Sequence, residues 1–243
     1  MISKQGWINL YKPKNISSFK AINFIKKKLS INKIGHAGTL DPMAEGVLPI
    51  AIGKATKLIP YISNMNKEYE FTVTWGSQTT TDDAEGNILF ESNYLPKNEE
   101  IKKKIINYIG YINQIPPKVS AVKINGKRAY KLFRENKKFK IQPKKVFVED
   151  LFIKNHSINE TSFKILCGKG FYVRSLARDL AIDLKTYGHI SSLKRLKVGK
   201  FTEKTSILLD DLLKIGQRHN EINCISPTIS MLDDILAYEI DDQ

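Results

Sequence analysis

Apolar and polar residues alternate strictly through the segment KEYEFTVTWG. Tyr69, Phe71, Val73 and Trp75 fall on one side of an extended backbone and polar residues fall on the other, which predicts a half-buried strand. Shorter alternations or apolar runs predict further strands in GWINLYKP, GVLPIAIGKATK, KVFVEDLFI, TSFKILC, FYVRS and SSLKRLKVGKF.

A period near 3.6 residues predicts three helices, in the segments SSFKAINFIKKKLS, NEEIKKKIINYIG and RSLARDLAIDLKTYG. Ser17 or Ser18 can cap the first and Asn98 the second, while Gly110 follows the second and Gly188 the third. The expected buried faces are Phe19, Ile22, Ile25 and Leu29; Ile101, Ile105 and Ile109; and Ala177, Leu180, Ala181 and Leu184. TTTDDAEGNI predicts a polar hairpin or loop, and the chain from LLDDLL onward is predicted to be short and helical. Because strands and helices do not alternate regularly, we expect an α+β fold with a mixed, largely antiparallel sheet and flanking helices.

The segment QIPPKVSAVKINGKRAYKLFRENKKFKIQPKK is crowded with lysine and arginine and has aromatic residues between them. A weak helical pattern is present only around Tyr130 to Phe133. We name residues 116–140 the basic flap. Its pattern is consistent with a nucleic-acid contact, and also with a solvated loop.

The chain of 243 residues carries 39 Lys and Arg against 25 Asp and Glu, a formal net charge of +14. That balance favours a polyanionic partner, whether RNA, DNA or an anionic membrane surface. A lysine-rich composition is also typical of AT-rich genomes, and this sequence is rich in Ile and Asn as well. With 42% apolar residues, the chain can bury an ordinary core as one large domain or two small ones.

Several function classes lack their sequence patterns. Cys167 and Cys224 do not form a CxxC pair, which argues against disulfide frameworks and zinc knuckles. There is no signal-peptide core and no apolar run of ~18 residues, so we expect a cytoplasmic protein that does not enter a membrane. The GxGxxG, Walker A and HExxH motifs are missing, which leaves dinucleotide, NTP and zinc-protease chemistry without support.

The stretch GHAGTLDPMAEG places Asp41 between Leu40 and Pro42. Proline biases the preceding residue toward an extended backbone, so the carboxylate is held in place, either for an Asx turn or for chemistry. A nucleophilic carboxylate must stay ionised while shielded from water, which requires an opposing cation or several donors. Arg174 is a candidate counter-ion, and it could instead contact phosphate or form a surface salt bridge.

Tyr69, Tyr172, Leu193 and His36 are further candidates, each with a structural alternative. Tyr69 can stack on a nucleobase while its hydroxyl hydrogen-bonds, or it can pack in the core. Tyr172 could be an ordinary sheet aromatic, and Leu193 a core residue. His36 could contact phosphate or base, act as a catalytic base or be buried structurally, whereas metal binding is disfavoured because no second histidine is nearby.

An ordered series of motifs between about residues 6 and 200 resembles the TruB-type tRNA pseudouridine synthases. The aspartate motif is GHAGTLDPMAEGVLPIAIGKATK, with LYKPKNISS before it and KEYEFTVTWG, TDDAEG, QIPPKVSAVKINGKRAYKL, GKGFYVRSLARDL and SSLKRL after it. The resemblance implies the pseudouridine synthase fold, as a single catalytic domain over residues 1–243. It also implies that uridine is converted to pseudouridine at position 55 in the T loop of tRNA, with no cofactor and no metal.

By the same resemblance, Asp41 is the catalytic nucleophile. It is needed to break the uridine C1′–N1 bond, after which the uracil rotates and is rejoined through C5. Attack on the ribose and attack on the base both stay open. Arg174 pairs with the nucleophile, and Tyr69 stacks on the target base.

The remaining residues would hold the RNA. His36 enters the T loop and helps to keep the target uridine flipped out, at a cost of a few kcal/mol that stacking and backbone contacts offset. Tyr172 and Leu193 line the uracil pocket. The basic flap resembles the RNA-gripping insertion of the family.

The sequence also departs from the family pattern. Thr80 precedes the TDDAEG loop where many relatives carry an acidic residue, and we expect the common C-terminal RNA-binding domain of the PUA type to be absent. Two alternatives to the tRNA enzyme remain: a catalytically silent RNA-binding or tRNA-folding module, and a synthase that acts on another RNA, such as one guided by a small RNA within a larger particle. A monomer is the default expectation.

Overall fold

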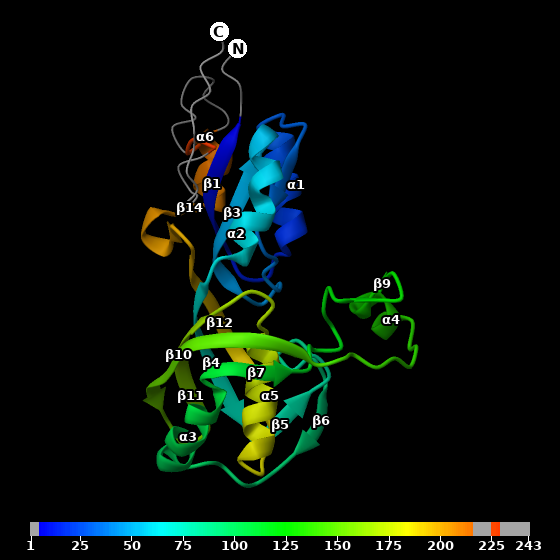
Figure 1. The fold of residues 1–243 in the computed structure, drawn as a ribbon, viewed down its shortest axis with the longest axis vertical. Coiled ribbons are helices and arrows are strands. Elements are labelled where there is room, and N and C mark those ends of the chain that lie inside the picture. Colours follow the sequence, from blue (N-terminus) through cyan, green and yellow to red (C-terminus); the bar gives the residue numbers. More distant parts are fainter. Residues whose placement is uncertain (1–4, 216–224, 229–243) are drawn as a thin grey trace. The chain divides into compact units, whose positions relative to one another are not determined.

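The computed structural model describes residues 5–215 and 225–228, and most of the segment predicted to be helical after LLDDLL lies outside them. The chain forms two compact units (Figure 1). The first unit comprises residues 1–65 and 196–243, and the second comprises residues 66–195. That the chain is a single catalytic domain without a PUA domain stays a prediction.

The first unit is built around two long antiparallel strands. Its strands are β1 (Gly6–Lys12), β2 (Ile34–His36), β3 (Glu45–Ile52), β13 (Phe201–Thr202) and β14 (Ile207–Leu208). The order is β14-β1-β3, with β1 and β14 parallel, and β2 also pairs with β3. β1 pairs with β3 over its whole length, from Gly6 opposite Ile52 to Lys12 opposite Gly46. The strand predictions for GWINLYKP and for the run before Gly53 are therefore confirmed.

Helical segments also contribute to the described part of the first unit. They are α1 (Ser18–Lys28), a 3-10 helix (Gly53–Leu58), α2 (Ile59–Asn64), a second 3-10 helix (Glu203–Thr205) and α6 (Leu209–Ile215). Ser17 caps α1, as predicted, because its hydroxyl accepts the backbone N–H of Lys20 at 3.1 Å. The prediction that Phe19 is buried is wrong, since this residue is 72% exposed. The buried stripe is centred on Ser18, Ala21, Ile22, Ile25 and Leu29, and Phe19 lies roughly 100° around the helix from it.

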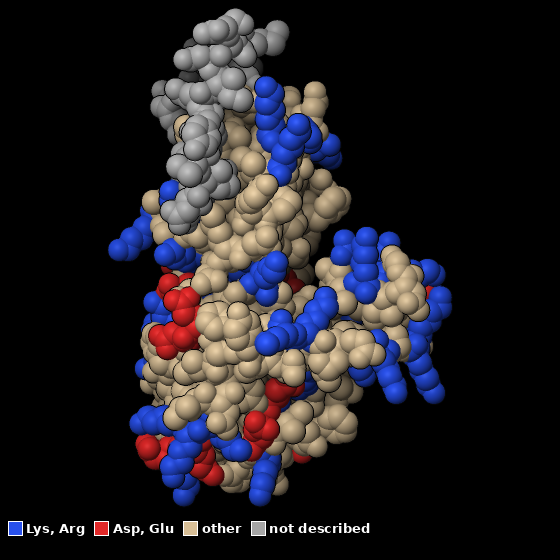
Figure 2. Space-filling model, in the orientation of Figure 1, with Lys and Arg blue, Asp and Glu red and all other residues tan. Residues whose placement is uncertain are grey.

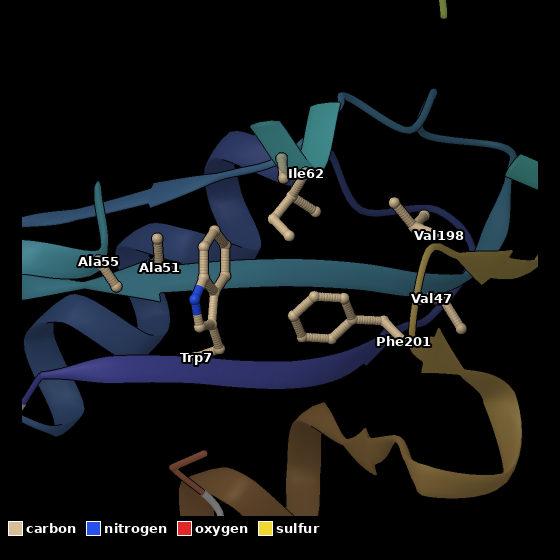
Figure 3. Packing of buried hydrophobic residues seen from close by; sticks show 8 residues of the cluster. Trp7, Val47, Ala51, Ala55, Ile62, Val198 and Phe201 are labelled. Atoms are coloured by element: carbon tan, nitrogen blue, oxygen red, sulfur yellow. The ribbon is translucent and has the colours of Figure 1, made fainter. Parts of the chain in front are cut away.

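The core of the first unit gathers around Trp7 (Figure 3). The indole meets the ring of Phe201 edge to face, with centroids 5.6 Å apart. Its Nε1 donates to the carbonyl oxygen of Thr228 at 3.0 Å, so the polar atom of this buried side chain is satisfied. The other members of the cluster are Ala37, Val47, Ala51, Ala55, Ile62 and Val198.

The second unit contains a predominantly antiparallel sheet. Its strands are β4 (Lys67–Trp75), β5 (Ser77–Thr79), β6 (Ile88–Glu91), β7 (Gly110–Gln114), β8 (Lys123–Ile124), β9 (Lys127–Arg128), β10 (Lys144–His156), β11 (Glu160–Cys167) and β12 (Gly188–Val198), the last of which continues into the first unit. The order is β12-β4-β11-β10-β7, and the pairs from β4 to β7 are antiparallel. Phe71, Val73 and Trp75 are buried as the alternation predicts. The expected α+β fold with a largely antiparallel sheet is confirmed.

The helices of the second unit are α3 (Asn98–Ile105), a 3-10 helix (Ile106–Tyr108), α4 (Ala129–Arg134) and α5 (Val173–Asp183). α3 begins at Asn98 instead of being capped by it, and the carboxylate of Glu100 accepts the backbone N–H of Lys97 at 2.8 Å. The chain leaves the α-helical path after Ile105, so Ile109 is 43% exposed and its predicted burial is wrong.

The prediction of a strand at FYVRS is also wrong. Tyr172 has an extended backbone, but α5 begins directly after it at Val173. The side chain of Gln114 takes the place of a neighbouring strand: its Oε1 accepts the N–H of Tyr172 at 2.8 Å and its Nε2 donates to the Tyr172 carbonyl at 3.0 Å. Arg174 therefore lies in the first turn of α5.

The basic flap folds as a small hairpin, β8 and β9, followed directly by α4. Ala129 and Leu132 of α4 are buried, which confirms the helical pattern predicted there. Lysine and arginine side chains cover much of the flap surface (Figure 2). Among the described residues, no helix is long and apolar enough to cross a membrane.

Candidate active site

Asp41 lies in the first unit, on the loop between β2 and β3. The backbone N–H of Ala44 donates to the Asp41 carbonyl at 3.1 Å, which closes a turn. Ser18, at the start of α1, grips the preceding residue: its hydroxyl accepts the N–H of Leu40 and donates to the Leu40 carbonyl, both at 2.9 Å. The carboxylate is therefore carried by a loop whose backbone is fixed on both sides of Asp41.

Lys12 is a buried residue that sequence reasoning missed. Its side chain is fully buried, and its ammonium donates to the carbonyl oxygens of Pro13 at 2.8 Å, Ile16 at 2.7 Å and Pro42 at 3.3 Å. A buried ammonium surrounded by carbonyl dipoles ties the end of β1 to the Asp41 loop. The signal in the sequence was a lysine within an alternating apolar strand, directly before a proline.

His36 ends β2 and pairs with Ile50 of β3. It is half-buried and belongs to the same unit as Asp41, five positions before it on the chain. The pairing of β2 with β3 fixes the backbone at the point where the loop that carries Asp41 begins. The first unit thus carries two of the six site residues predicted from the sequence.

The other four belong to the second unit. Tyr69 is half-buried on β4, opposite Ile165 of β11, and Leu193 is buried on β12. Tyr172 and Arg174 lie at the start of α5. Because Asp41 and Arg174 are in different units, their predicted pairing stays a prediction.

Arg174 is held by a buried network within the second unit. Its Nη1 donates to the Thr81 carbonyl at 2.9 Å and lies 3.4 Å from a carboxylate oxygen of Asp83, and its Nη2 donates to the Val119 carbonyl at 3.0 Å. The Arg174 and Asp83 side chains are 4% and 3% exposed. One guanidinium thus connects the loop between β5 and β6 to the start of the basic flap, before β8.

Arg178, one helical turn further along α5, repeats this arrangement. Its Nη1 donates to a carboxylate oxygen of Asp82 at 3.0 Å and its Nη2 to the Ile115 carbonyl at 2.8 Å. Asp179 receives a third bond from Nε at 2.9 Å, and burial raises the pKa of the Asp179 carboxyl. TDDAEG was predicted to be a polar loop, and its two aspartates are buried ion-pair partners of α5.

Cys167 is inert in this setting. It is fully buried on β11, and burial raises the pKa of its thiol to about 12. Within the described part of the chain, no group of three or more His, Cys, Asp or Glu side chains is arranged to hold a metal ion.

Comparisons with known proteins agree on one family. Residues 26–173 match the family described as "TruB family pseudouridylate synthase (N terminal domain)", and residues 174–237 match "tRNA pseudouridylate synthase B C-terminal domain". Among curated relatives named tRNA pseudouridine synthase B, the one from Ehrlichia chaffeensis is 47% identical over 95% of this chain and 78% of its own length. The one from Caulobacter sp. is 41% identical over 98% of this chain and 77% of its own length.

Solved structures extend the likeness to three dimensions. A Cbf5–Nop10–Gar1 complex matches with a TM-score of 0.72 and 27% identity, over 92% of this chain and 60% of the matched chain. An H/ACA RNP bound to a substrate RNA containing 2′-deoxyuridine matches with a TM-score of 0.66 and 26% identity, over 86% of this chain and 52% of the matched one. The fold is that of an RNA-modifying enzyme of the pseudouridine synthase class. Within that class, the chain belongs to the TruB family.

Proposed function

We propose that this protein converts uridine to pseudouridine at position 55 in the T loop of tRNA, with Asp41 as the nucleophile. Membership of the TruB family and relatives named tRNA pseudouridine synthase B support the reaction and the tRNA substrate. The observation that carries the role of Asp41 is its loop, which is fixed by three hydrogen bonds, one from Lys12 to the Pro42 carbonyl and two between Ser18 and Leu40.

The reaction is an isomerisation. The C1′–N1 bond of the uridine breaks with the help of Asp41, the freed uracil turns within the pocket, and C5 forms the new bond to C1′. The proton that leaves C5 is balanced by the one gained at N1, so no oxidant, reductant or group donor is consumed. What the protein must supply is a fixed carboxylate, a pocket for the flipped base and a charge that keeps the carboxylate ionised.

The second unit supplies the other parts of the proposed site. In this proposal Arg174 is the counter-charge for Asp41, and its bonds to Thr81 and Val119 hold the guanidinium in place within the second unit. Tyr69 stacks on the base, while Tyr172 and Leu193 line its pocket. His36, from the first unit, occupies the space that the flipped uridine leaves in the T loop.

The direct test uses a T-arm hairpin tritiated at C5 of the target uridine. The native chain should release tritium, and Asp41→Asn should release it at least about 10³-fold more slowly because the nucleophile is gone. Asp150→Asn is the matched control, since it removes an exposed carboxylate on β10 and should retain activity. If the native chain binds the hairpin but releases no tritium, the protein is the silent RNA-binding module instead.

The basic flap is proposed to grip the RNA backbone. Lys123, Lys127 and Lys131 are exposed on β8, β9 and α4, and changing all three to Glu should weaken RNA binding. The slope of log affinity against log salt should become shallower by about 2 to 3, because each lost phosphate contact contributes about 0.7 to 0.9. An unchanged slope would mean that the flap is a solvated loop.

We also propose that the protein acts as a monomer in the cytoplasm. Light scattering on the full chain at micromolar concentration tests the first point, and a mass near 27.7 kDa is expected. Fractionation of the native cells tests the second, with the protein expected alongside tRNA in the fraction free of membranes.

A further inference from the structure

The outward face of α1 is both basic and aromatic. Phe19 and Phe24 are 72% and 40% exposed, although their rings are large enough to belong in a core. Lys20 and Lys27 are exposed on the side of the helix opposite the stripe that packs on the first unit, and Lys26 is exposed on its flank, next to Phe19. The Lys20 ammonium lies 5.8 Å from the centroid of the Phe24 ring, within reach of a cation–π interaction.

The charge around this face is one-sided. Residues 1–40 contain eight lysines and no aspartate or glutamate, so α1 has no acidic residue of its own. α6 packs against α1 and carries Asp210 and Asp211, but Asp211 is paired with Lys214 of the same helix at 3.3 Å. Such a surface attracts a polyanion, because little negative charge nearby offsets the charge of its lysines.

A groove of about 510 Å³ opens at the end of α1. Its lining supplies ammonium, amide and hydroxyl groups and no carboxylate, which is the chemistry that recognises a phosphate. The lining residues are Asn23, Lys26, Lys27, Ser30, Ile31 and Asn32.

α1 is also physically joined to the Asp41 loop. Ser18, its first residue, holds Leu40 through two hydrogen bonds of 2.9 Å, and both belong to the first unit. The eleven residues of α1 make it about 16 Å long, so its last turn is roughly that far from the residue that grips the loop. An RNA whose reacting uridine meets Asp41 therefore has neighbouring phosphates within reach of the helix, at a distance of about five base pairs.

We propose that the outward face of α1 is a second docking surface for the substrate RNA, and that it contacts the stem next to the loop containing the target uridine. Lys20, Lys26 and Lys27 bind phosphates there, and Phe19 and Phe24 pack against ribose. An anionic membrane is the other polyanion to consider. A membrane-surface helix inserts a broad apolar face, whereas the apolar face of α1 is buried in the core and only two rings point outward. RNA is therefore the occupant that fits.

The inference rests on the proposed function, and the test separates the two. The triple variant Lys20→Gln, Lys26→Gln, Lys27→Gln keeps good helix formers at exposed positions, so it should fold. The matched control changes Lys102, Lys103 and Lys104 of α3 to Gln and removes the same charge elsewhere. Two hairpins carry the same loop, one on a stem of about three base pairs and one on a stem of about eight, longer than α1.

Binding of each hairpin is measured as a function of salt. For the long stem, the α1 variant should make the slope of log affinity against log salt shallower by about 2 to 3 and weaken binding at least tenfold in low salt. The short stem should show a much smaller change, and the α3 variant should match the native chain on both. Changing Phe19 and Phe24 to Ala should weaken binding to the long stem without altering the slope, because no charge is removed.

Two results would overturn the inference while leaving the enzyme assignment intact. One is an α1 variant with the native slope on the long stem, in a protein that still releases tritium. The other is binding to vesicles containing phosphatidylserine that depends on the three α1 lysines while RNA binding does not. A native chain that releases no tritium, by contrast, would refute the proposed function without bearing on the slopes of log affinity against log salt.

Discussion

The buried pair between Arg174 and Asp83 should be a large single contribution to the stability of the second unit. The perturbation is Asp83→Asn, which keeps the shape of the side chain and removes its charge. At 3.4 Å and an effective dielectric constant of 20, the Coulomb attraction is about 5 kcal/mol. The desolvation of both groups offsets part of this in the native chain, but removing one partner leaves the other charge buried.

Asp83 has further bonds that an asparagine retains only in part. Its Oδ1 accepts the Thr81 hydroxyl at 2.5 Å and the Glu85 backbone N–H at 3.1 Å. We therefore expect Asp83→Asn to cost about 3 kcal/mol, near the lower end of the range for broken buried pairs. For a chain of this size, that lowers the melting temperature by roughly 6–12 °C.

Asp82→Asn is the internal comparison. The Asp82–Arg178 pair is shorter, at 3.0 Å, but its side chains are 9% and 16% exposed, so water screens the charges. Arg178 also keeps its ion pair with Asp179 when Asp82 is neutralised. A cost of about 1 kcal/mol is expected. If the distance between the charges decided the cost, Asp82→Asn would be the more destabilising change. If burial decides it, Asp83→Asn is the more destabilising change.

The assay can read the second unit alone. The chain has two tryptophans, Trp7 in the first unit and Trp75 in the second, so a Trp7→Phe background leaves Trp75 as the fluorescent reporter. Urea and thermal unfolding followed at Trp75 give the two losses, and the double variant with Arg174→Met gives the coupling energy of the pair. If Asp83→Asn costs no more than Asp82→Asn, the argument from burial is refuted.

Three further predictions concern single sites. Burial, and then the charge of Arg195, lowers the pKa of Lys67 to about 8, so the folded state binds fewer protons than the unfolded state between pH 8 and its ordinary 10.5. The stability of the native chain should therefore rise with pH across that window. The variant Lys67→Met should be more stable than the native chain at pH 7 and should lose this advantage by about pH 10. A difference in melting temperature between the two proteins that stays constant with pH would contradict this. In a Cys224→Ser background, Cys167 should react with a thiol reagent only after denaturant is added, because burial raises the pKa of its thiol to about 12. Rapid labelling of the folded Cys224→Ser protein would contradict this prediction. Gly199→Ala should cost about 1–2 kcal/mol by thermal unfolding, because Gly199 has φ +52°, in the left-handed region, and an added Cβ would force Sδ of Met65 to shift. A neutral result would mean that both the backbone and the methionine adapt freely.

The sheet could be predicted from the sequence because one of its faces is buried. Where that holds, as along β4, burial forces a period of two into the sequence, and Phe71, Val73 and Trp75 follow it. The same logic located the buried side of α5. It failed at Phe19, which continues the helical spacing of α1 but lies beyond the edge of the stripe, because a spacing of three residues drifts by about 60° at each step.

FYVRS shows why a short apolar run does not define a strand. Its aromatic and β-branched residues favour an extended backbone, and Tyr172 has one, but a strand also needs a neighbour. Gln114 satisfies both backbone groups of Tyr172 with a side chain 58 positions away, and no local pattern indicates such a partner. The resulting change matters for the site, since it places Arg174 within a helix that fixes its direction.

The two aspartates of TDDAEG could have been anticipated by a different line of reasoning. Arg174 and Arg178 are four positions apart in a helix whose composition is otherwise largely apolar, so they share a side and lie close to buried surface. Arginines in that position need acceptors, and two successive acids in a polar loop supply them. The spacing therefore predicts that Arg174 and Arg178 each meet an acid, while the pairing itself, across more than ninety positions, follows only from the fold that brings the β5–β6 loop to α5.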